Sequence, residues 1–241
     1  AYFGDHPTFD VVGLTTPGEG KYWVAGAGSR YEHYERLKAT APERLPRFFI
    51  VYPEWMACDP VLGAQIYEAT VTDSTILGGQ TMGVYVADYD VLGAGEDAWT
   101  TGITTATLVD AVDVADLESE ASHQYELLGA RDGEETVRAS LTPDGRSVAD
   151  GGRTNRLRER FVAHLKAGQP ARFVARVESQ RRQRVQVVAN GREIGSLPLL
   201  GGGEWEEAEL VLPADTVAND TTIELRAEAP FSSFHYYFGG M

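Results

Sequence analysis

The sequence predicts an α+β protein that is mainly β, in which a small α/β unit precedes an antiparallel β-sandwich of the jelly-roll kind. The last third is a succession of short alternating segments separated by turn residues, which is typical of a sandwich. These segments are RFVAHL, ARFVARVE, RVQVVANGREIGSL, EWEEAELVLP and TTIELRAE. The first third instead places a helical pattern between two apolar segments. With 43% apolar residues in 241, the chain can bury one large core or two modest ones.

The first unit is predicted to be an α/β layer because a strand, a helix and a second strand follow one another. FDVVGL is an apolar segment that ends in the turn-rich TTPGEG, and RFFIVYP is interpreted as a buried strand. A helical crossover between two strands of one sheet favours parallel pairing. Further on, YEATVTD and MGVYVADYD alternate in polarity, which predicts a hairpin.

The helix between the two strands is predicted over SRYEHYERLKATAPE. Ser29 is a candidate N-cap, and Glu32 three residues later completes a capping box. Tyr31, Tyr34 and Leu37 fall near one helical face, which we expect to be the buried one.

The weakest pattern lies in residues 91–106, which contain the predicted linker. We therefore predict a small α/β domain over 1–105 and a β-sandwich domain over 106–241. LVDAVDVADLESEASHQYELLG enters the sandwich as an extended strand, ETVRASLT and RSVADGGR add edge elements, and FSSFHYYF is an aromatic final strand. Asn190-Gly191 is the strongest local signal, because both residues of a type I′ turn need positive φ.

Charge is distributed unevenly along the chain. Residues 1–130 carry 20 acidic and 6 basic side chains, whereas residues 131–241 carry 16 and 15. Of the 21 basic residues 18 are Arg, a bias that we interpret as GC-rich coding or halophilic adaptation. The net charge of −15 argues against nucleic acid as a partner, because its phosphates demand clustered positive charge.

Neither a membrane span nor a signal peptide is predicted in these residues. No run of about 18 apolar residues occurs. The first ten residues, AYFGDHPTFD, have no basic start and no apolar core, so we expect a piece of a longer chain. Cys58 is the single cysteine and leaves the compartment open.

Catalytic motifs are missing from the sequence. GxSxG, HExxH and CxxC do not occur, and the five histidines are scattered. Glycoside hydrolysis needs only two carboxylates about 5–10 Å apart, so that alternative stays open. GAGS, just before the predicted helix, could hold a phosphate at the helix N-terminus, although the full dinucleotide fingerprint is absent.

Polar and aromatic residues of the second half form a candidate ligand site. Sugar recognition needs planar hydrogen-bonding groups beside an aromatic face, and Trp205, Tyr236 and Tyr237 could supply that face. The alternative is that the aromatic residues are core and that Asp150 and Arg153 form a structural ion pair. The candidate ligand-binding residues are Glu120, His123, Asp150, Arg153, Trp205, His235 and Tyr236, with Tyr237 as a further aromatic.

An acidic run at the start of the second half is a candidate Ca²⁺ site. Calcium accepts about six to eight oxygen ligands, and sandwiches can bind it with dispersed residues. The candidate ligands are Asp113, Asp116 and Glu118, between Asp110 and Glu120. Their spacing fits no EF-hand, and a solvated acidic face is the alternative. No other cofactor is predicted.

Motifs over nearly the whole chain resemble the extracytoplasmic tails of bacterial membrane proteins related to the GT-C (dolichyl-phosphate-mannose-type) glycosyltransferases. In the first half the resemblance rests on FDVVGLTTP and IVYPEW. In the second half it rests on SEASHQY, VADGGR, ERFVAHLKAG, ARFVAR, VVANGREIG, the Trp205 strand and SSFHYYF. The resemblance implies an extracytoplasmic protein, periplasmic or at the cell surface, that is anchored by an upstream membrane portion and handles lipid-linked sugars. The membrane helices that hold the acidic catalytic residues of such enzymes are not in this sequence.

Together these observations predict a non-catalytic domain with a carbohydrate-binding-module-like sandwich. It would bind or position a glycan or lipid-linked sugar beside the membrane. A free-standing glycan-active hydrolase and a structural cell-surface interaction module are the two alternatives.

Overall fold

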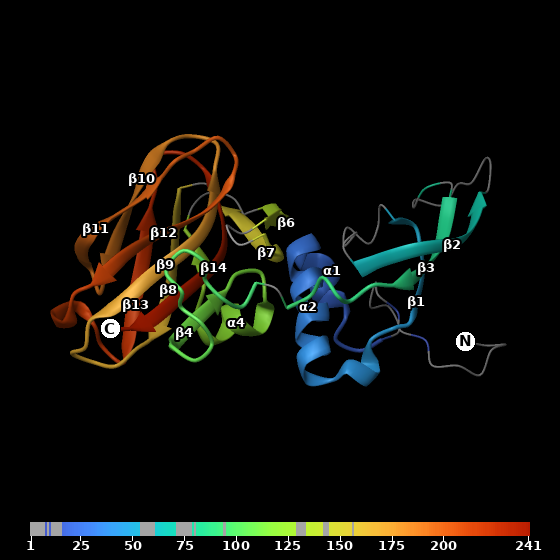
Figure 1. Ribbon diagram of the computed structural model, residues 1–241, viewed down its shortest axis with the longest axis horizontal. Helices are drawn as coiled ribbons and strands as arrows, with labels where there is room; N and C mark the ends of the chain where they lie inside the picture. The colour runs from blue at the N-terminus through green and yellow to red at the C-terminus, as the bar shows by residue number, and fades with distance from the viewer. Residues whose placement is uncertain are drawn as a thin grey trace. The chain divides into compact units, whose positions relative to one another are not determined.

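The computed structural model describes residues 8, 10, 16–53, 61–70, 79, 81–93, 95–128, 134–141, 145–155 and 157–241, with side chains except at 134–141 and 155. Residue contacts divide the chain into two compact units, Ala1–Gly93 and Ala94–Met241 (Figure 1). The sequence placed this boundary near residue 105. The structure assigns the intervening segment to the second unit, because Ala98 and Ile103 pack against Tyr237 there. No helix within the described ranges is long and apolar enough to cross a bilayer.

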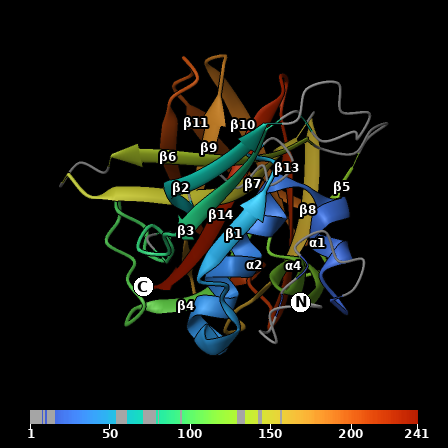
Figure 2. The same ribbon diagram turned by 90° about the vertical axis from the view of Figure 1, so that its right-hand side faces the viewer.

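The first unit pairs two helices and a short 3₁₀ turn with an antiparallel sheet. The predicted hairpin is confirmed, since β2 and β3 pair antiparallel. The described sheet has the order β1-β3-β2 and no parallel pair, because β1 also runs antiparallel to β3 (Figure 2). The predicted strand FDVVGL lies, apart from Asp10, outside the described residues. The elements are α1 (Gly20–Ala25), α2 (Ala27–Thr40), a 3₁₀ helix (Pro42–Arg44), β1 (Phe48–Val51), β2 (Leu62–Thr70) and β3 (Thr81–Ala87).

Strand β1 was interpreted from sequence as buried, and this is wrong for one of its faces. Phe48 and Ile50 are 51% and 66% exposed, whereas Phe49 and Val51 are buried. The apolar run therefore forms a strand with only one buried face. An apolar run alone does not distinguish such a strand from one that is buried on both faces.

Helix α2 buries the predicted face, since Tyr31, Tyr34 and Leu37 are all buried. The predicted N-cap at Ser29 is wrong, because the helix begins at Ala27 and Ser29 lies buried inside it. Gly26 takes the cap position with φ of 117°, a conformation that favours glycine. Of the two glycines in GAGS, Gly26 thus separates α1 from α2, and Gly28 lies inside α2.

The second unit is an antiparallel β-sandwich, as predicted. In its described part, one sheet has five strands in the order β11-β10-β13-β8-β5. The other has six, in the order β12-β9-β14-β7-β6 with β4 paired to β14. The strands are β4 (Leu108–Asp113), β5 (Glu126–Leu127), β6 (Glu134–Leu141), β7 (Ser147–Asn155), β8 (Arg158–His164), β9 (Ala171–Ser179), β10 (Gln183–Ala189), β11 (Arg192–Leu199), β12 (Trp205–Leu212), β13 (Asp220–Arg226) and β14 (Phe231–Gly240).

The entry segment is a strand followed by a short helix, which the sequence did not predict. Helix α4 (Leu117–Ser122) starts directly after Asp116, whose side chain accepts a hydrogen bond from the Ser119 amide at 2.7 Å. An acidic side chain at this position satisfies one of the free amides of the first helical turn.

A second 3₁₀ helix, Ala214–Thr216, forms part of the connection between β12 and β13.

The sandwich core lies between the two sheets, and alternate residues of each strand point into it. In β9, Phe173, Ala175 and Val177 are core residues, so the residues between them face outward from the six-stranded sheet. Facing them across the core are side chains of the five-stranded sheet: Phe161, Val185, Val187, Leu197, Ile223 and Leu225.

One carboxylate lies within this apolar core. Glu159 is fully buried and accepts hydrogen bonds from Ser233 at 2.9 Å, from Tyr125 at 2.6 Å and from Tyr236. Burial first, and then the charge of Glu159, raise the pKa of Tyr125 and Tyr236 well above the ordinary value. Both hydroxyls therefore stay protonated and serve as donors to the carboxylate.

The turn at Asn190-Gly191 has the predicted geometry, with φ of 49° and 82° between β10 and β11. A Cβ at Gly191 would meet no atom within 4 Å, so only the backbone disfavours a larger residue. We expect Gly191→Val to lower the free energy of unfolding by about 1–3 kcal/mol. Gly191→Asn is the matched control, because Asn tolerates positive φ. Equal urea midpoints for the two variants would contradict this account of the turn.

Candidate functional site

Arg176 is a fully buried guanidinium on the outward side of β9. Its NH1 group donates to Asp150 Oδ2 at 2.8 Å and its NH2 group donates to Glu207 Oε1 at 3.0 Å. Burial lowers the pKa of Arg176, but electrostatic interactions with Tyr237, Asp150 and Glu207 outweigh burial, so the pKa lies above its ordinary value. The guanidinium is therefore a permanent cation shared by two buried carboxylates.

Residues 95–105 are held against the sheet by this group of side chains. Arg176 also donates to the backbone carbonyls of Gly95 and Asp97, both at 2.8 Å. Glu207 accepts a hydrogen bond from the Thr100 amide at 2.8 Å. Residues 95–105 of the predicted linker are therefore an ordered part of the sandwich.

Two tryptophans border the guanidinium. Trp99 and Trp205 are each half-buried, and their rings meet edge to face with centroids 5.6 Å apart. The Arg176 guanidinium lies 4.5 Å from the Trp99 ring and 5.2 Å from the Trp205 ring. Tyr237 is buried beside them, with its ring 5.1 Å from the same guanidinium. An aromatic corner thus adjoins charged groups whose positions are fixed.

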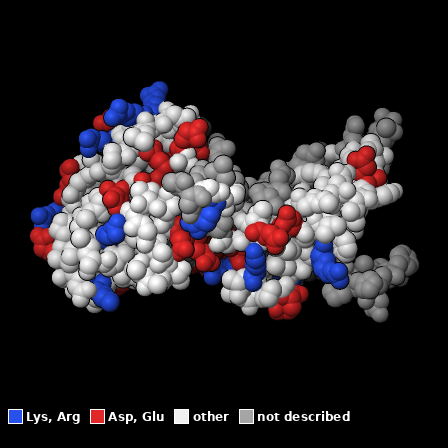
Figure 3. All heavy atoms as spheres, viewed as in Figure 1, with Lys and Arg blue, Asp and Glu red and all other residues white. Residues whose placement is uncertain are grey.

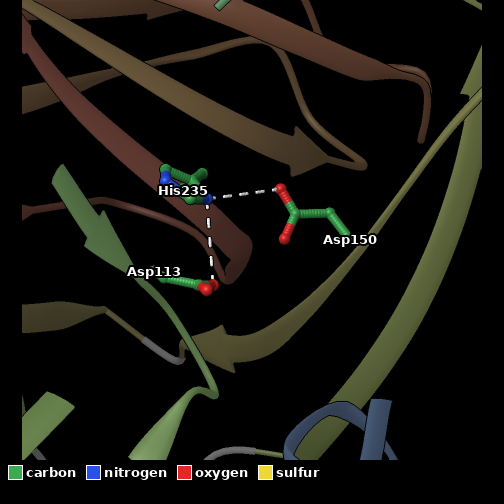
Figure 4. A group of neighbouring side chains, drawn as sticks. All are labelled: Asp113, Asp150 and His235. Carbon is green, nitrogen blue, oxygen red and sulfur yellow. Dashed lines mark ion pairs between the residues drawn. The ribbon is translucent and has the colours of Figure 1, made fainter. Parts of the chain in front are cut away.

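His235 extends the site toward β4. It lies directly across from Asp113 in the antiparallel register and stacks on Tyr237 at 4.3 Å. Its Nδ1 atom is 3.8 Å from Asp113 Oδ1 and 3.7 Å from Asp150 Oδ2 (Figure 4). Burial first, and then the charges of Arg176 and His123, hold the pKa of His235 well below its ordinary value. The ring is therefore neutral near pH 7.

These groups form one continuous site on the outward face of the six-stranded sheet, which we call the outer-face cluster. Carboxylates, a guanidinium, an imidazole and aromatic rings converge there, which is the residue chemistry of a polar ligand site. The cluster consists of Trp99, Asp113, Asp150, Arg176, Trp205, Glu207, His235 and Tyr237.

Three of the seven predicted ligand residues, Asp150, Trp205 and His235, belong to the cluster. Glu120 and Arg153 instead pair with each other, through the Arg153 NH2 group at 2.8 Å and through Nε. Arg153 therefore uses its donor fork within the protein, and Asp150 takes Arg176 as its ion-pair partner.

The other two predicted ligand residues have structural positions. His123 is buried, with Nδ1 2.8 Å from the Ser119 carbonyl and Nε2 3.2 Å from Asp110 Oδ1. Tyr236 faces the interior of the sandwich and stacks on Phe161 at 4.6 Å. Its neighbour Tyr237 faces the cluster instead, because successive residues of a strand point to opposite sides.

The candidate calcium ligands do not gather as the sequence suggested. Asp116 caps helix α4, and Glu118 lies on that helix. Asp113 instead joins Asp150 and His235, and the three donor atoms lie within 4.8 Å of one another. Among the described residues this is the one group of three or more potential metal ligands.

Sequence reasoning missed Arg176, Glu207 and Trp99. The available signal was an arginine in the middle of the apolar run FVARVE, at a position of the same parity as Val174 and Glu178. A charged residue there must find a partner if the outward face is covered. Its partners are on other strands and in the predicted linker, so no local pattern pointed to them.

A hollow of about 250 Å³ lies elsewhere on the sandwich, beside the Asn190 turn. Its polar groups are engaged in the fold, because the Asn190 amide donates to the Thr216 carbonyl and accepts from the Thr222 amide. Arg192 pairs with Asp215 at its rim. The hollow has no aromatic lining, so the outer-face cluster is the stronger candidate site.

The solved structures that resemble this chain include several carbohydrate-binding modules. A module of Cellvibrio mixtus lichenase 5A, in complex with cellotriose, is 10% identical over 56% of this chain and 98% of its own, with a TM-score of 0.35. The C-terminal family 6 module of a Zobellia galactanivorans laminarinase is 11% identical over 54% and 97%, with a TM-score of 0.33. A family 35 module from Clostridium thermocellum is 14% identical over 48% and 98%, with a TM-score of 0.29.

No protein-family model and no curated protein sequence matches the chain. The comparisons give no support to the glycosyltransferase resemblance, which stays a prediction from sequence motifs.

The buried ion pairs predict a large effect at Arg176. Arg176→Met would leave Asp150 and Glu207 buried without their cation, and we expect the free energy of unfolding to fall by about 3–5 kcal/mol. Arg192→Met is the matched control, because the Arg192–Asp215 pair is 64% and 65% exposed and is expected to contribute about 0–1 kcal/mol. Urea unfolding of both variants measures the difference. Similar losses would show that Arg176 is not the centre of the cluster.

Proposed function

We propose that the second unit is a non-catalytic carbohydrate-binding module whose outer-face cluster holds a glycan or lipid-linked sugar. The observation that carries the proposal is the half-buried corner of Trp99 and Trp205 beside carboxylates fixed by a buried guanidinium. Aromatic rings offer apolar contact to the C–H faces of a sugar, and the carboxylate of Asp113, whose side chain is 26% exposed, accepts hydrogen bonds from its hydroxyl groups.

The accessible atoms of the cluster lie at its edge. Trp99 and Trp205 are half-buried and the Asp113 side chain is 26% exposed, whereas Arg176 and Tyr237 lie beneath them. The buried groups therefore set the positions of the groups that would meet a ligand. A site whose side chains are ordered in advance loses less entropy on binding.

Binding is favoured over glycoside hydrolysis by what the carboxylates already do. Asp150 and Glu207 both accept hydrogen bonds from Arg176, and Glu207 accepts a third from the Thr100 amide. A glycosidase needs one carboxyl group that carries a proton to donate. Neither carboxylate is arranged as such a donor.

The setting of the module is a further part of the proposal. On the motifs that resemble GT-C glycosyltransferase tails, we place it outside the cytoplasm, joined to an upstream membrane portion. Acidic and basic side chains are interspersed over the second unit on the face drawn in Figure 3, which suits a neutral polar ligand better than a polyanion. Upstream coding sequence with about ten hydrophobic helices would support this setting, and its absence would leave a free-standing module.

A glycan screen followed by calorimetry tests the binding site. We expect affinity in the range of roughly micromolar to millimolar. Trp99→Ala should weaken it by about tenfold or more, since losing about 1.4 kcal/mol of aromatic contact corresponds to tenfold. Trp99→Phe should retain part of the affinity because it keeps a ring.

Tyr67→Ala is the control for this test, because Tyr67 is a 65% exposed aromatic in the first unit. It should leave affinity unchanged. Unfolding midpoints confirm that each variant is folded. If a broad screen found neither binding nor hydrolysis, the interpretation as a structural interaction module would take the place of this proposal.

A further inference from the structure

Three strands bring Asp113, Asp150 and His235 together at one edge of the outer-face cluster. They come from β4, β7 and β14, and in Figure 4 the imidazole nitrogen of His235 points between the two carboxylates. All three donor atoms lie within 4.8 Å of one another. Because each residue lies on a paired strand, the arrangement is set by the register of the sheet.

The imidazole is the informative member of this group. His235 is 7% exposed, and its Nδ1 atom is buried and has no hydrogen-bond partner among the described residues. The nearest carboxylate oxygens, at 3.7 and 3.8 Å, are beyond hydrogen-bond distance. A buried nitrogen without a partner is costly, and a cation held between His235 and the two carboxylates would satisfy it.

The donor types and spacing indicate which cation fits. Ligands on one tetrahedral Zn²⁺ ion at about 2.0–2.2 Å lie roughly 3.4 Å from one another. The distances from His235 Nδ1, 3.7 and 3.8 Å, need only a small contraction. An imidazole beside carboxylates suits zinc and its neighbours, whereas Ca²⁺ takes oxygen ligands. Arg176 donates to Asp150 Oδ2, the same oxygen that lies 3.7 Å from His235 Nδ1, and would fix the position of that ligand as outer partners of ligating carboxylates do.

We propose that Asp113, Asp150 and His235 bind a divalent transition-metal ion of the Zn²⁺ class, with an open coordination position beside the partly exposed Asp113. This site does not rest on glycan binding. It also differs from the calcium set expected from the sequence, since only Asp113 is shared and the nitrogen ligand replaces Asp116 and Glu118.

The test is a titration of the chelator-treated full chain with ZnCl₂ alone, followed by calorimetry and thermal unfolding. We expect one ion per chain and a melting temperature that rises with Zn²⁺ concentration, because an ion that binds only the folded state stabilises it. Co²⁺ in place of Zn²⁺ should give the visible absorption of a four-coordinate ion. Neither readout involves a sugar, so failure of the glycan screen would leave this result intact.

Variants identify the ligands. Losing an outer partner of a metal site weakens metal binding by about 10–100-fold. His235→Ala removes a direct ligand, so it should weaken Zn²⁺ binding by more than that. Asp113→Asn, at the exposed edge, gives a second variant if His235→Ala does not fold, and it should also weaken binding. His164→Ala is the matched control, because His164 is 47% exposed, pairs with Asp220 and should leave affinity unchanged.

Three results would overturn the proposal. One is the absence of stoichiometric Zn²⁺ binding by the folded chain. Another is binding that His164→Ala abolishes and His235→Ala preserves, which would place the ion at His123 and His164, whose rings are 5.2 Å apart. The third is selective binding of Ca²⁺ over Zn²⁺ in direct competition, which would exclude a nitrogen-containing site.

Discussion

The buried guanidinium of Arg176 is the constraint on which the outward side of the sandwich depends. Removing an arginine from water costs several kcal/mol, and only well-placed acceptors offset that cost. The protein supplies two carboxylates, two backbone carbonyls and three aromatic rings. Each acceptor is thereby fixed in turn. The chain from Gly95 to Thr100 has no regular structure of its own. It lies against the sheet because the carbonyls of Gly95 and Asp97 accept hydrogen bonds from Arg176.

Strand parity determines which residues enter the cluster. In β14, Tyr236 and Phe238 face the core, while His235 and Tyr237 face outward. The register of β14 against β9 shifts between Ser233 and His235. This irregularity determines which face of the sheet each later residue of β14 points to. A slip of one residue would exchange Tyr236 with Tyr237, and would move the partner of Glu159 out of the core. The buried carboxylate on one side and the buried guanidinium on the other therefore specify the same register.

How far the sequence predicts this structure depends on how local each cause is. The sandwich strands and the Asn190-Gly191 turn follow from alternation and backbone preference, so they were predicted. Arg176 was missed because its acceptors lie on other strands and on a segment that resembles a linker. Tyr236 was predicted as a ligand-binding residue ahead of Tyr237, because the composition of the strand does not reveal which of the two side chains faces outward. His235 and Asp150 were predicted as site residues, but their meeting with Asp113 depends on the pairing of β4 with β14, which no local pattern encodes.

The charge of the outer-face cluster connects the two proposals without making either depend on the other. With the metal position empty, the carboxylates of Asp113 and Asp150 repel a carboxylate or phosphate group of a ligand that lies against them. A neutral sugar pays no such cost, because its hydroxyl groups donate to the carboxylates. For a lipid-linked sugar, the phosphate must therefore lie away from Asp113 and Asp150, with the sugar ring toward Trp99 and Trp205. A bound divalent ion would remove that restriction, so the occupancy of the metal position would decide which part of an anionic glycolipid the face accepts.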